Sequence, residues 1–322
     1  MQQGNASCRL RPVCWGACLA WLGASLNAQP PAQIAPLKVF DIQTVWAGAA
    51  PAGKVHRVRG GRSLYFHVSP SWNTQASSIV RTNGAGLVEQ VIKLPEEAFI
   101  EDFAVDAAGA VYVELTRAGR NGKTDLMVYT PSGALVQTVS APAGLCPTAS
   151  AMLGVTDSNG RLTLAPLGSE SRPLAQVSLR RPDPVITLAL PDGRVAIVEK
   201  TAAVVHLVDL QRGTEVPVMP RVPEMQWLAT LAPGDYARNV AFGDAVAGPD
   251  GRIFLLLGHY KSAEGAAVVS FHMNGNLFET IRYRVPRVSE NAEFMVPSYL
   301  TVYGGDTMVM VSGDGKVAEY PL

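Results

Sequence analysis

The sequence has few cysteines, and their distribution excludes a disulfide framework. Cysteine occurs four times in 322 residues, and Cys8, Cys14 and Cys18 all lie close to the N-terminus. Beyond them only Cys146 remains, so the body of the chain cannot form the intramolecular bridges that hold small secreted domains together. The neighbours of Cys146 are apolar, which predicts a small buried side chain rather than a reactive nucleophile.

An excess of charge of one sign is also absent. The chain has 27 basic and 27 acidic residues, a formal net charge of +0, and only 17% charged residues. Two groups of arginines alternate with apolar residues, as solvent-facing strand positions do: Arg57, Arg59 and Arg62, and Arg282, Arg284 and Arg287. We therefore expect no nucleic-acid partner. With 48% hydrophobic residues, the chain has the composition of a folded domain with a large core.

The long hydrophobic run of a membrane-spanning helix is missing too. The apolar stretch from Val13 to Leu26 is shorter than the ~20 residues that a span needs, follows a short positive region and precedes small residues. This pattern predicts a cleaved signal peptide at residues 1–28 and a mature domain at residues 29–322 without a membrane span. The protein would then be secreted or periplasmic. An uncleaved anchor and a lipoprotein attached through Cys18 are the alternatives.

Common catalytic signatures are absent as well. The sequence contains no Gly-x-Ser-x-Gly nucleophile elbow, no His-x-x-x-His zinc pair, no phosphate-binding glycine-rich loop and no dinucleotide fingerprint. These absences remove the usual hydrolase, protease, kinase and dehydrogenase hypotheses. Four of the five histidines, His56, His67, His206 and His272, lie in strand-like patterns, for which a structural role is the default. Whether the chain is an enzyme stays open at this stage.

What the sequence does contain is a repeated hairpin. Strand-like segments alternate with Gly, Pro, Asp and Asn turns, and no amphipathic helix of normal length lies between them, which predicts an all-β fold. An Asp or Asn beside Gly supplies the positive backbone angles of a tight turn. The first apolar residue after each of these turns marks six units: Leu64, Val111, Leu162, Val195, Ile253 and Met308.

A second hairpin follows most of the first hairpins, so each unit has four antiparallel strands. This is the composition of a propeller blade, and we predict a six-bladed β-propeller. The last unit ends after three strands at Leu322, and residues 37–46 form an unassigned strand before the first unit. We expect that strand to close the last blade and remove its open edge. A seven-bladed propeller and two packed β-sandwiches are the alternatives.

The Asp-x-x-Gly turns and the second hairpins with Tyr-x-x-x-Gly, of which Tyr129 and Gly133 are the clearest pair, resemble the NHL-like six-bladed β-propeller superfamily. The resemblance extends over nearly the whole mature chain. It implies the fold alone, because members of that superfamily include binding scaffolds, lactonases and lyases.

The predicted turns divide the ring into two faces. Short turns, among them those at residues 106–109 and 157–160, are expected on one face, and every long connection on the other. Binding groups are usually carried on loops held by a rigid scaffold, so we expect a platform for a protein or carbohydrate ligand on the long-connection face. Its candidate binding residues are Trp72, Arg117, Arg120, Trp227, Tyr236, Arg238, His259 and Tyr260.

The second hypothesis is a metal-assisted hydrolase or lyase, similar to a lactonase, with its site in the central channel. Carboxylates and amides at the inner ends of the first strands could converge there on a hard divalent cation such as calcium. The candidate metal ligands are Glu101, Asp102, Asn239, Asn291 and Glu293.

Overall fold

Strands make up almost all of the regular structure, as the sequence predicts. The computed structural model describes residues 33–51, 53–71, 76–96, 98–117, 124–140, 144–169, 171–180, 185–220, 242–257, 266–271, 278–286 and 295–322. The predicted signal peptide lies outside these residues. Residues Gln33–Leu322 form one compact unit, in which the described strands are arranged in six sheets, five of four strands and one of five.

Four of the sheets are each built from four consecutive strands, and we call them blades 1 to 4. Blades 1 and 2 contain β3 (Lys54–Arg59), β4 (Leu64–Ser69), β5 (Ser78–Thr82) and β6 (Val88–Lys93), then β7 (Ala98–Val105), β8 (Val111–Arg117), β9 (Thr124–Tyr129) and β10 (Leu135–Ser140). Blades 3 and 4 contain β11 (Leu145–Pro147), β12 (Met152–Ser158), β13 (Arg161–Pro166) and β14 (Ala175–Ser178), then β15 (Val185–Ala189), β16 (Val195–Glu199), β17 (Val204–Asp209) and β18 (Thr214–Val218).

The other two sheets, blades 5 and 6, each include a strand from the beginning of the described chain. Blade 5 contains β19 (Phe242–Ala247), β20 (Ile253–Leu257), β21 (Ala266–Phe271), β22 (Phe278–Tyr283) and β1 (Gln33–Ile34). Blade 6 contains β23 (Pro297–Tyr303), β24 (Thr307–Ser312), β25 (Lys316–Pro321) and β2 (Lys38–Asp41). The six sheets correspond one to one to the six units predicted from the sequence.

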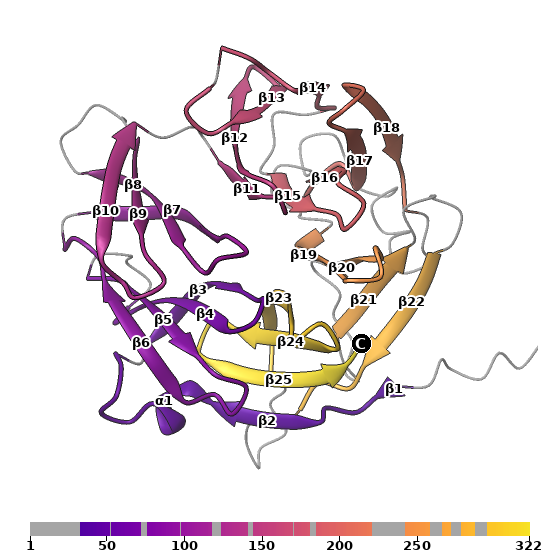
Figure 1. The fold of residues 1–322 in the computed structure, drawn as a ribbon. Helices are drawn as coiled ribbons and strands as arrows, with labels where there is room; N and C mark the ends of the chain where they lie inside the picture. The colour runs from indigo at the N-terminus through magenta and orange to yellow at the C-terminus, as the bar shows by residue number, and fades with distance from the viewer. Residues whose placement is uncertain are drawn as a thin grey trace, which may run out of the picture. The chain divides into compact units, whose positions relative to one another are not determined.

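The prediction that an N-terminal strand closes the last blade is confirmed. Strand β2 pairs antiparallel with β25, with Lys38 opposite Glu319 and Asp41 opposite Lys316, and Figure 1 shows the two strands side by side. The predicted strand is too long at its C-terminal end. It stops at Asp41, whose carboxylate accepts a hydrogen bond from the Gln43 amide at 2.9 Å and begins the helical turn α1 (Ile42–Val45).

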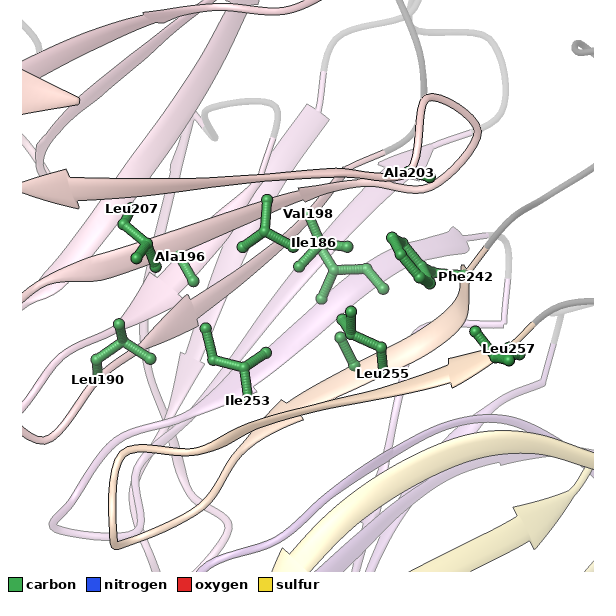
Figure 2. Packing of buried hydrophobic residues seen from close by; sticks show 12 residues of the cluster. Ile186, Leu190, Ala196, Val198, Ala203, Leu207, Phe242, Ile253, Leu255 and Leu257 are labelled. Carbon is green, nitrogen blue, oxygen red and sulfur yellow. The ribbon is translucent and has the colours of Figure 1, made fainter. Parts of the chain in front are cut away.

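The first strands of the blades form the inner wall of a closed ring (Figure 1). Strand β3 lies next to β7, β7 next to β11, β11 next to β15, β15 next to β19, β19 next to β23, and β23 next to β3. Each of the six seams between neighbouring blades has its own cluster of buried apolar side chains. Figure 2 shows the seam between blades 4 and 5, where Val198 and Ile186 lie opposite Leu255 and Phe242. The hydrophobic core is therefore a set of six interfaces.

Blade 3 is out of phase with its prediction. The turn at residues 157–160 was expected between the first and second strands, but it joins β12 and β13, the second and third strands. The first strand is β11, which has only three residues and includes Pro147, so it resembles a loop in sequence. The turn at 157–160 consequently lies on the face of the long connections. In the corrected phase, Met152 takes the place assigned to Leu162.

Outside blade 3, the connections follow the predicted division into two faces. The long ones join second to third strands, as between β4 and β5, or successive blades, as between β18 and β19. In blade 3, the long connection at residues 167–174 joins the third and fourth strands, β13 and β14, and therefore lies on the face where only short turns were expected. The short turns at 106–109 and 191–193 join first to second strands on the opposite face. Among the described residues, no helix has the length and apolar character that crossing a membrane requires.

Candidate functional site

A cavity of about 360 Å³ lies in the channel at the inner ends of blades 1 to 4. We call it the channel cavity. It is lined by Arg57, Arg59, Glu101, Asp102, Glu114, Gly144, Leu145, Val155, Asp157, Leu162, Val185, Ile186 and Thr187. Gly144 directly precedes β11, the first strand of blade 3, and Val185 begins β15, the first strand of blade 4. Asp157 lies beside the connection between β12 and β13, the second and third strands of blade 3. The cavity is thus in the half of the channel nearer the long connections.

Asp102 on β7 is the centre of an ion-pair cluster on the cavity wall. Its Oδ2 lies 2.8 Å from Nη1 of Arg57, and its Oδ1 lies 3.1 Å from Nη2 of Arg59. The Phe103 amide donates a further hydrogen bond to Oδ1 at 2.5 Å, and Nε of Arg59 donates to the Phe103 carbonyl at 3.1 Å. Because all these groups lie on first strands, the inner wall of the ring holds them in fixed positions.

The two arginines correct an interpretation of the sequence. Their alternation with apolar residues suggested solvent-facing positions, whereas both side chains are partly buried in the channel, where Arg57 and Arg59 retain 36% and 25% of their exposure. Alternation of polar and apolar residues assigns side chains to the two faces of a strand, but it does not show whether the polar face is turned to the outer solvent or to the channel. A residue on the innermost strand of a propeller can face the channel, and these two do.

Glu114 on β8 is the most unusual titratable group of the cavity. It lies opposite Asp102 in the strand pair, and only 2% of the residue is exposed. Its Oε2 is buried without a hydrogen-bond partner among the described residues. Burial, together with the negative charges of Asp102 and Glu101, raises the pKa of Glu114 to about 8, against an opposing effect of Arg57. The carboxyl group is therefore mostly protonated at neutral pH.

A second buried carboxylate lies farther round the channel and links two blades. Asp244 on β19 accepts a hydrogen bond from the Leu300 amide of β23 at 2.8 Å. Burial raises the pKa of Asp244, and the charges of Arg59 and Arg57 oppose that rise. Lys200, which follows β16, has a pKa lowered chiefly by burial, with Asp244 as the main opposing charge. The channel therefore contains several charges that partly compensate one another.

Most of the predicted site residues lie outside the described part of the chain. This applies to Trp72, Arg120, Trp227, Tyr236, Arg238, His259 and Tyr260 of the binding set, and to Asn239, Asn291 and Glu293 of the metal set. The backbone of Arg117 forms the last position of β8. Asp102 and Glu101 do lie at the channel cavity, as their position at the inner end of a first strand predicted.

The arrangement around Asp102 differs from a metal site. Both of its carboxylate oxygens are engaged by guanidinium groups. Among the described residues, no group of three or more His, Cys, Asp or Glu side chains is placed to hold a metal ion. Asp102 therefore acts in this structure as the partner of two arginines.

The channel also opens at the face of the short turns, through a wider cavity of about 790 Å³. Turns between first and second strands line it, and most of the lining residues are small or apolar, such as Gly61, Ala108, Pro191 and Pro249. Charged residues are sparse in this lining, three of 24 against six of the 13 that line the channel cavity, so the channel cavity is the better candidate site. Sequence reasoning missed Glu114, because an acidic residue in a strand is usually solvent-facing.

No model of a known protein family matches the sequence, and no curated protein matches it significantly. Solved structures do match. A catalytically inactive virginiamycin B lyase from Staphylococcus aureus, solved with quinupristin, has a TM-score of 0.50 at 13% identity over 85% of this chain and 82% of its own. Hydrazine synthase of Kuenenia stuttgartiensis has 0.51 at 9% over 83% and 83%. The RRP9 WD40 repeats have 0.53 at 8% over 91% and 100%.

These similarities are too low in identity to carry any activity across, and they do not assign the chain to the NHL-like superfamily. They agree with the ring of small sheets described above. The chain is a β-propeller.

Proposed function

We propose that this propeller is a binding protein that takes a small polar ligand in the channel cavity, with the long connections forming the surroundings of its entrance. A cavity of about 360 Å³ is within the range of small-molecule sites. The platform expected from the sequence used loop residues as its binding groups. The proposal is narrower, because it places the specific contacts on the strands that line the channel cavity. Protein or carbohydrate contacts by the long connections, and export from the cytoplasm, remain part of the same proposal.

The observation that carries the proposal is the Arg57–Asp102–Arg59 cluster on the cavity wall. Placing three charged groups in a partly buried position costs desolvation energy, and apolar replacements of such groups are often neutral or stabilising. Clustered charges that line a cavity are therefore candidates for function. Each guanidinium has five N–H donors, and the contacts with Asp102 and Phe103 use only some of them.

The alternative, an enzyme with its site in the same channel, is favoured by one observation. Glu114, with a pKa of about 8, could hold or move a proton near neutral pH, as general acids and bases do. The metal-assisted form of this hypothesis needs ligands other than Asp102, and its remaining candidates lie outside the described residues.

The binding proposal is tested by filling the cavity without changing its charges. A β-carbon at Gly144 would meet only ordinary contacts, the nearest being Val155 Cβ at 3.7 Å, so Gly144→Leu should fold and occupy the cavity. The matched control is Gly61→Leu, because Gly61 lies at the other mouth with no neighbour within 4 Å of its β-carbon position.

Soaks and thermal-shift titrations would use acetate, inorganic phosphate, glucose and agmatine as probes. We expect at least one probe to stabilise the wild-type protein and the Gly61→Leu variant but not the Gly144→Leu variant. If no probe distinguishes the two glycine variants, the channel cavity is not the binding site.

A further inference from the structure

The carboxylates of the channel cavity outnumber its cations. Four acidic side chains line it, Glu101, Asp102, Glu114 and Asp157, against the two arginines, Arg57 and Arg59. Asp102 is neutralised by both arginines. In the part of the chain that the structure describes, Glu101, Glu114 and Asp157 have no salt-bridge partner. The cavity thus has one compensated carboxylate and three that lack a cation.

Glu114 is the member of this group whose environment points to a ligand. A buried polar atom without a hydrogen-bond partner loses its contacts with water and gains none in return, and native proteins contain few such atoms. Oε2 of Glu114 is such an atom, in a residue that is 2% exposed and lines a cavity. The neighbouring charges are Glu101 and Asp102 on β7, Asp157 on β12, and Arg57 and Arg59 on β3. A positively charged group in the cavity would supply what Glu114 lacks.

We propose that the ligand of the channel cavity carries an organic cation, an ammonium or guanidinium group, which Glu114 binds with the help of Glu101 and Asp157. This inference rests on the proposed binding function and specifies its ligand class. The arginines do not exclude a cation, because Asp102 compensates one of their two positive charges and the carboxylates of Glu101 and Asp157 outnumber the one that remains. The apolar wall of Leu145, Val155, Leu162 and Ile186 would pack against the carbon skeleton of the ligand.

Binding of a cation has a consequence for the proton of Glu114. With a pKa of about 8, the free carboxyl group holds a proton at pH 7. A cation in contact favours the ionised form, so binding lowers this pKa and releases up to about one proton. Affinity should consequently rise with pH until about 8 and then level off.

Isothermal titration calorimetry on the full chain tests the inference, with agmatine and methylammonium as the cationic probes and acetate, inorganic phosphate and calcium as comparisons. Titrations in two buffers with different ionisation enthalpies give the number of protons released. We expect the cationic probes to bind with proton release near pH 7, and agmatine, which has both cationic groups and a longer carbon chain, to bind more tightly.

The Glu114→Gln variant keeps the size of the side chain and should lose about tenfold or more in affinity together with the proton release. Asp157→Asn, at an exposed position that does not threaten folding, should weaken binding with proton release retained. Glu89→Gln is the control, because Glu89 lies on the outer strand β6, away from the cavity. There it pairs with Arg81 of the neighbouring strand β5. It should bind as the wild type does.

The outcomes separate the two proposals. If acetate, phosphate or calcium binds in a way that Gly144→Leu blocks, while neither amine does, the binding function holds and the cationic ligand is refuted. Cation binding that is unchanged in Glu114→Gln also refutes it. If no probe depends on the cavity, both proposals fail.

Discussion

The imidazole of His206 lies between two carboxylates at the seam of blades 3 and 4. Nε2 is 2.5 Å from Oε1 of the fully buried Glu199, and Nδ1 is 2.5 Å from Oε1 of Glu215. The Arg180 amide also contacts Glu199, at 3.1 Å from each carboxylate oxygen. Burial alone would lower the pKa of His206, but the hydrogen bonds and charges of Glu199 and Glu215 outweigh it and raise the pKa.

His206 therefore makes stability depend on pH. A folded-state pKa above the ordinary value of 6.5 means that the contribution is fully present below pH 6.5 and is lost as the pH rises through the raised pKa. We expect the free energy of unfolding to fall across that range. Removing the imidazole alone, in His206→Leu, should cost about 3–5 kcal/mol, because the buried Glu199 carboxylate then loses the imidazole that balances its charge.

Urea unfolding from about pH 6 to about pH 9 measures this effect. The Glu199→Gln/His206→Leu double variant is the control, since it removes both charges. It should recover much of the loss and fall less steeply with pH than the wild type, keeping only the slope that other groups such as Glu114 contribute. A wild type and a double variant with parallel pH profiles would contradict the assignment.

Single residues also show which side-chain roles can be predicted from sequence. Cys146 is buried, and burial raises the pKa of its thiol to about 12, so the predicted inert side chain is confirmed. The solvent-facing position predicted for Arg57 was wrong, and Glu114 was not singled out. Both are charged residues in strands, and their roles depend on which blade faces them across the channel. That information is tertiary and leaves no local pattern in the sequence.

At the scale of elements, the hairpins were predictable and the shortest pieces were not. Tight turns with Gly beside Asp or Asn give strong local signals, as at residues 106–109. Strand β11 has three residues, and β1 has two, which is below the length at which alternation can be recognised. The pairing of β1 with β22 is parallel and joins segments far apart in the sequence, so no turn announces it.

The helical turn α1 directly follows the closing strand β2 and ends at Trp46, whose buried side chain anchors this part of the chain. Nε1 of Trp46 donates a hydrogen bond to the Gly86 carbonyl at 3.0 Å, and the ring meets Phe66 edge-on with centroids 5.2 Å apart. Trp46 is fully buried in the cluster shared by blades 6 and 1.

We expect Trp46→Ala to lower the free energy of unfolding by about 3–5 kcal/mol, because it leaves a large cavity at the closing seam. Trp46→Phe keeps most of the ring packing and loses the hydrogen bond, so its cost should be clearly smaller. Chemical denaturation of the two variants measures the difference. Equal costs would mean that packing of the ring is not what holds this seam.

For the whole molecule, the ring order and its six units followed from the repeat, because every unit must bury its two faces against neighbours. The seams are nevertheless unequal. Among the described residues, the cluster between blades 2 and 3 has the fewest buried members, and the channel cavity extends toward it. These members are Ala104, Leu126, Val128, Leu145 and Met152. A seam with little buried apolar area gains less from the hydrophobic effect.

We therefore expect native-state hydrogen exchange to show the lowest protection on the two sides of this seam, in β9 and β12, and higher protection in β17 and β20, which flank the large cluster between blades 4 and 5. Met152→Ala should accelerate exchange in β9 and β12 more than in β17. Uniform protection around the ring would show that the propeller opens only as a whole.

The pairing of β2 with β25 also sets the timing of folding during synthesis. The ribosome makes β2 before any blade is present and makes β25 after five blades are complete. The cost of closing so long a loop grows only slowly with its length, so the final pairing is not prevented by distance. Until β25 has been synthesised, however, β2 has no strand to pair with and blade 6 lacks its two outer strands. A prematurely terminated chain would therefore be an open arc with two unpaired edges, a form that proteases and chaperones can distinguish from the finished protein.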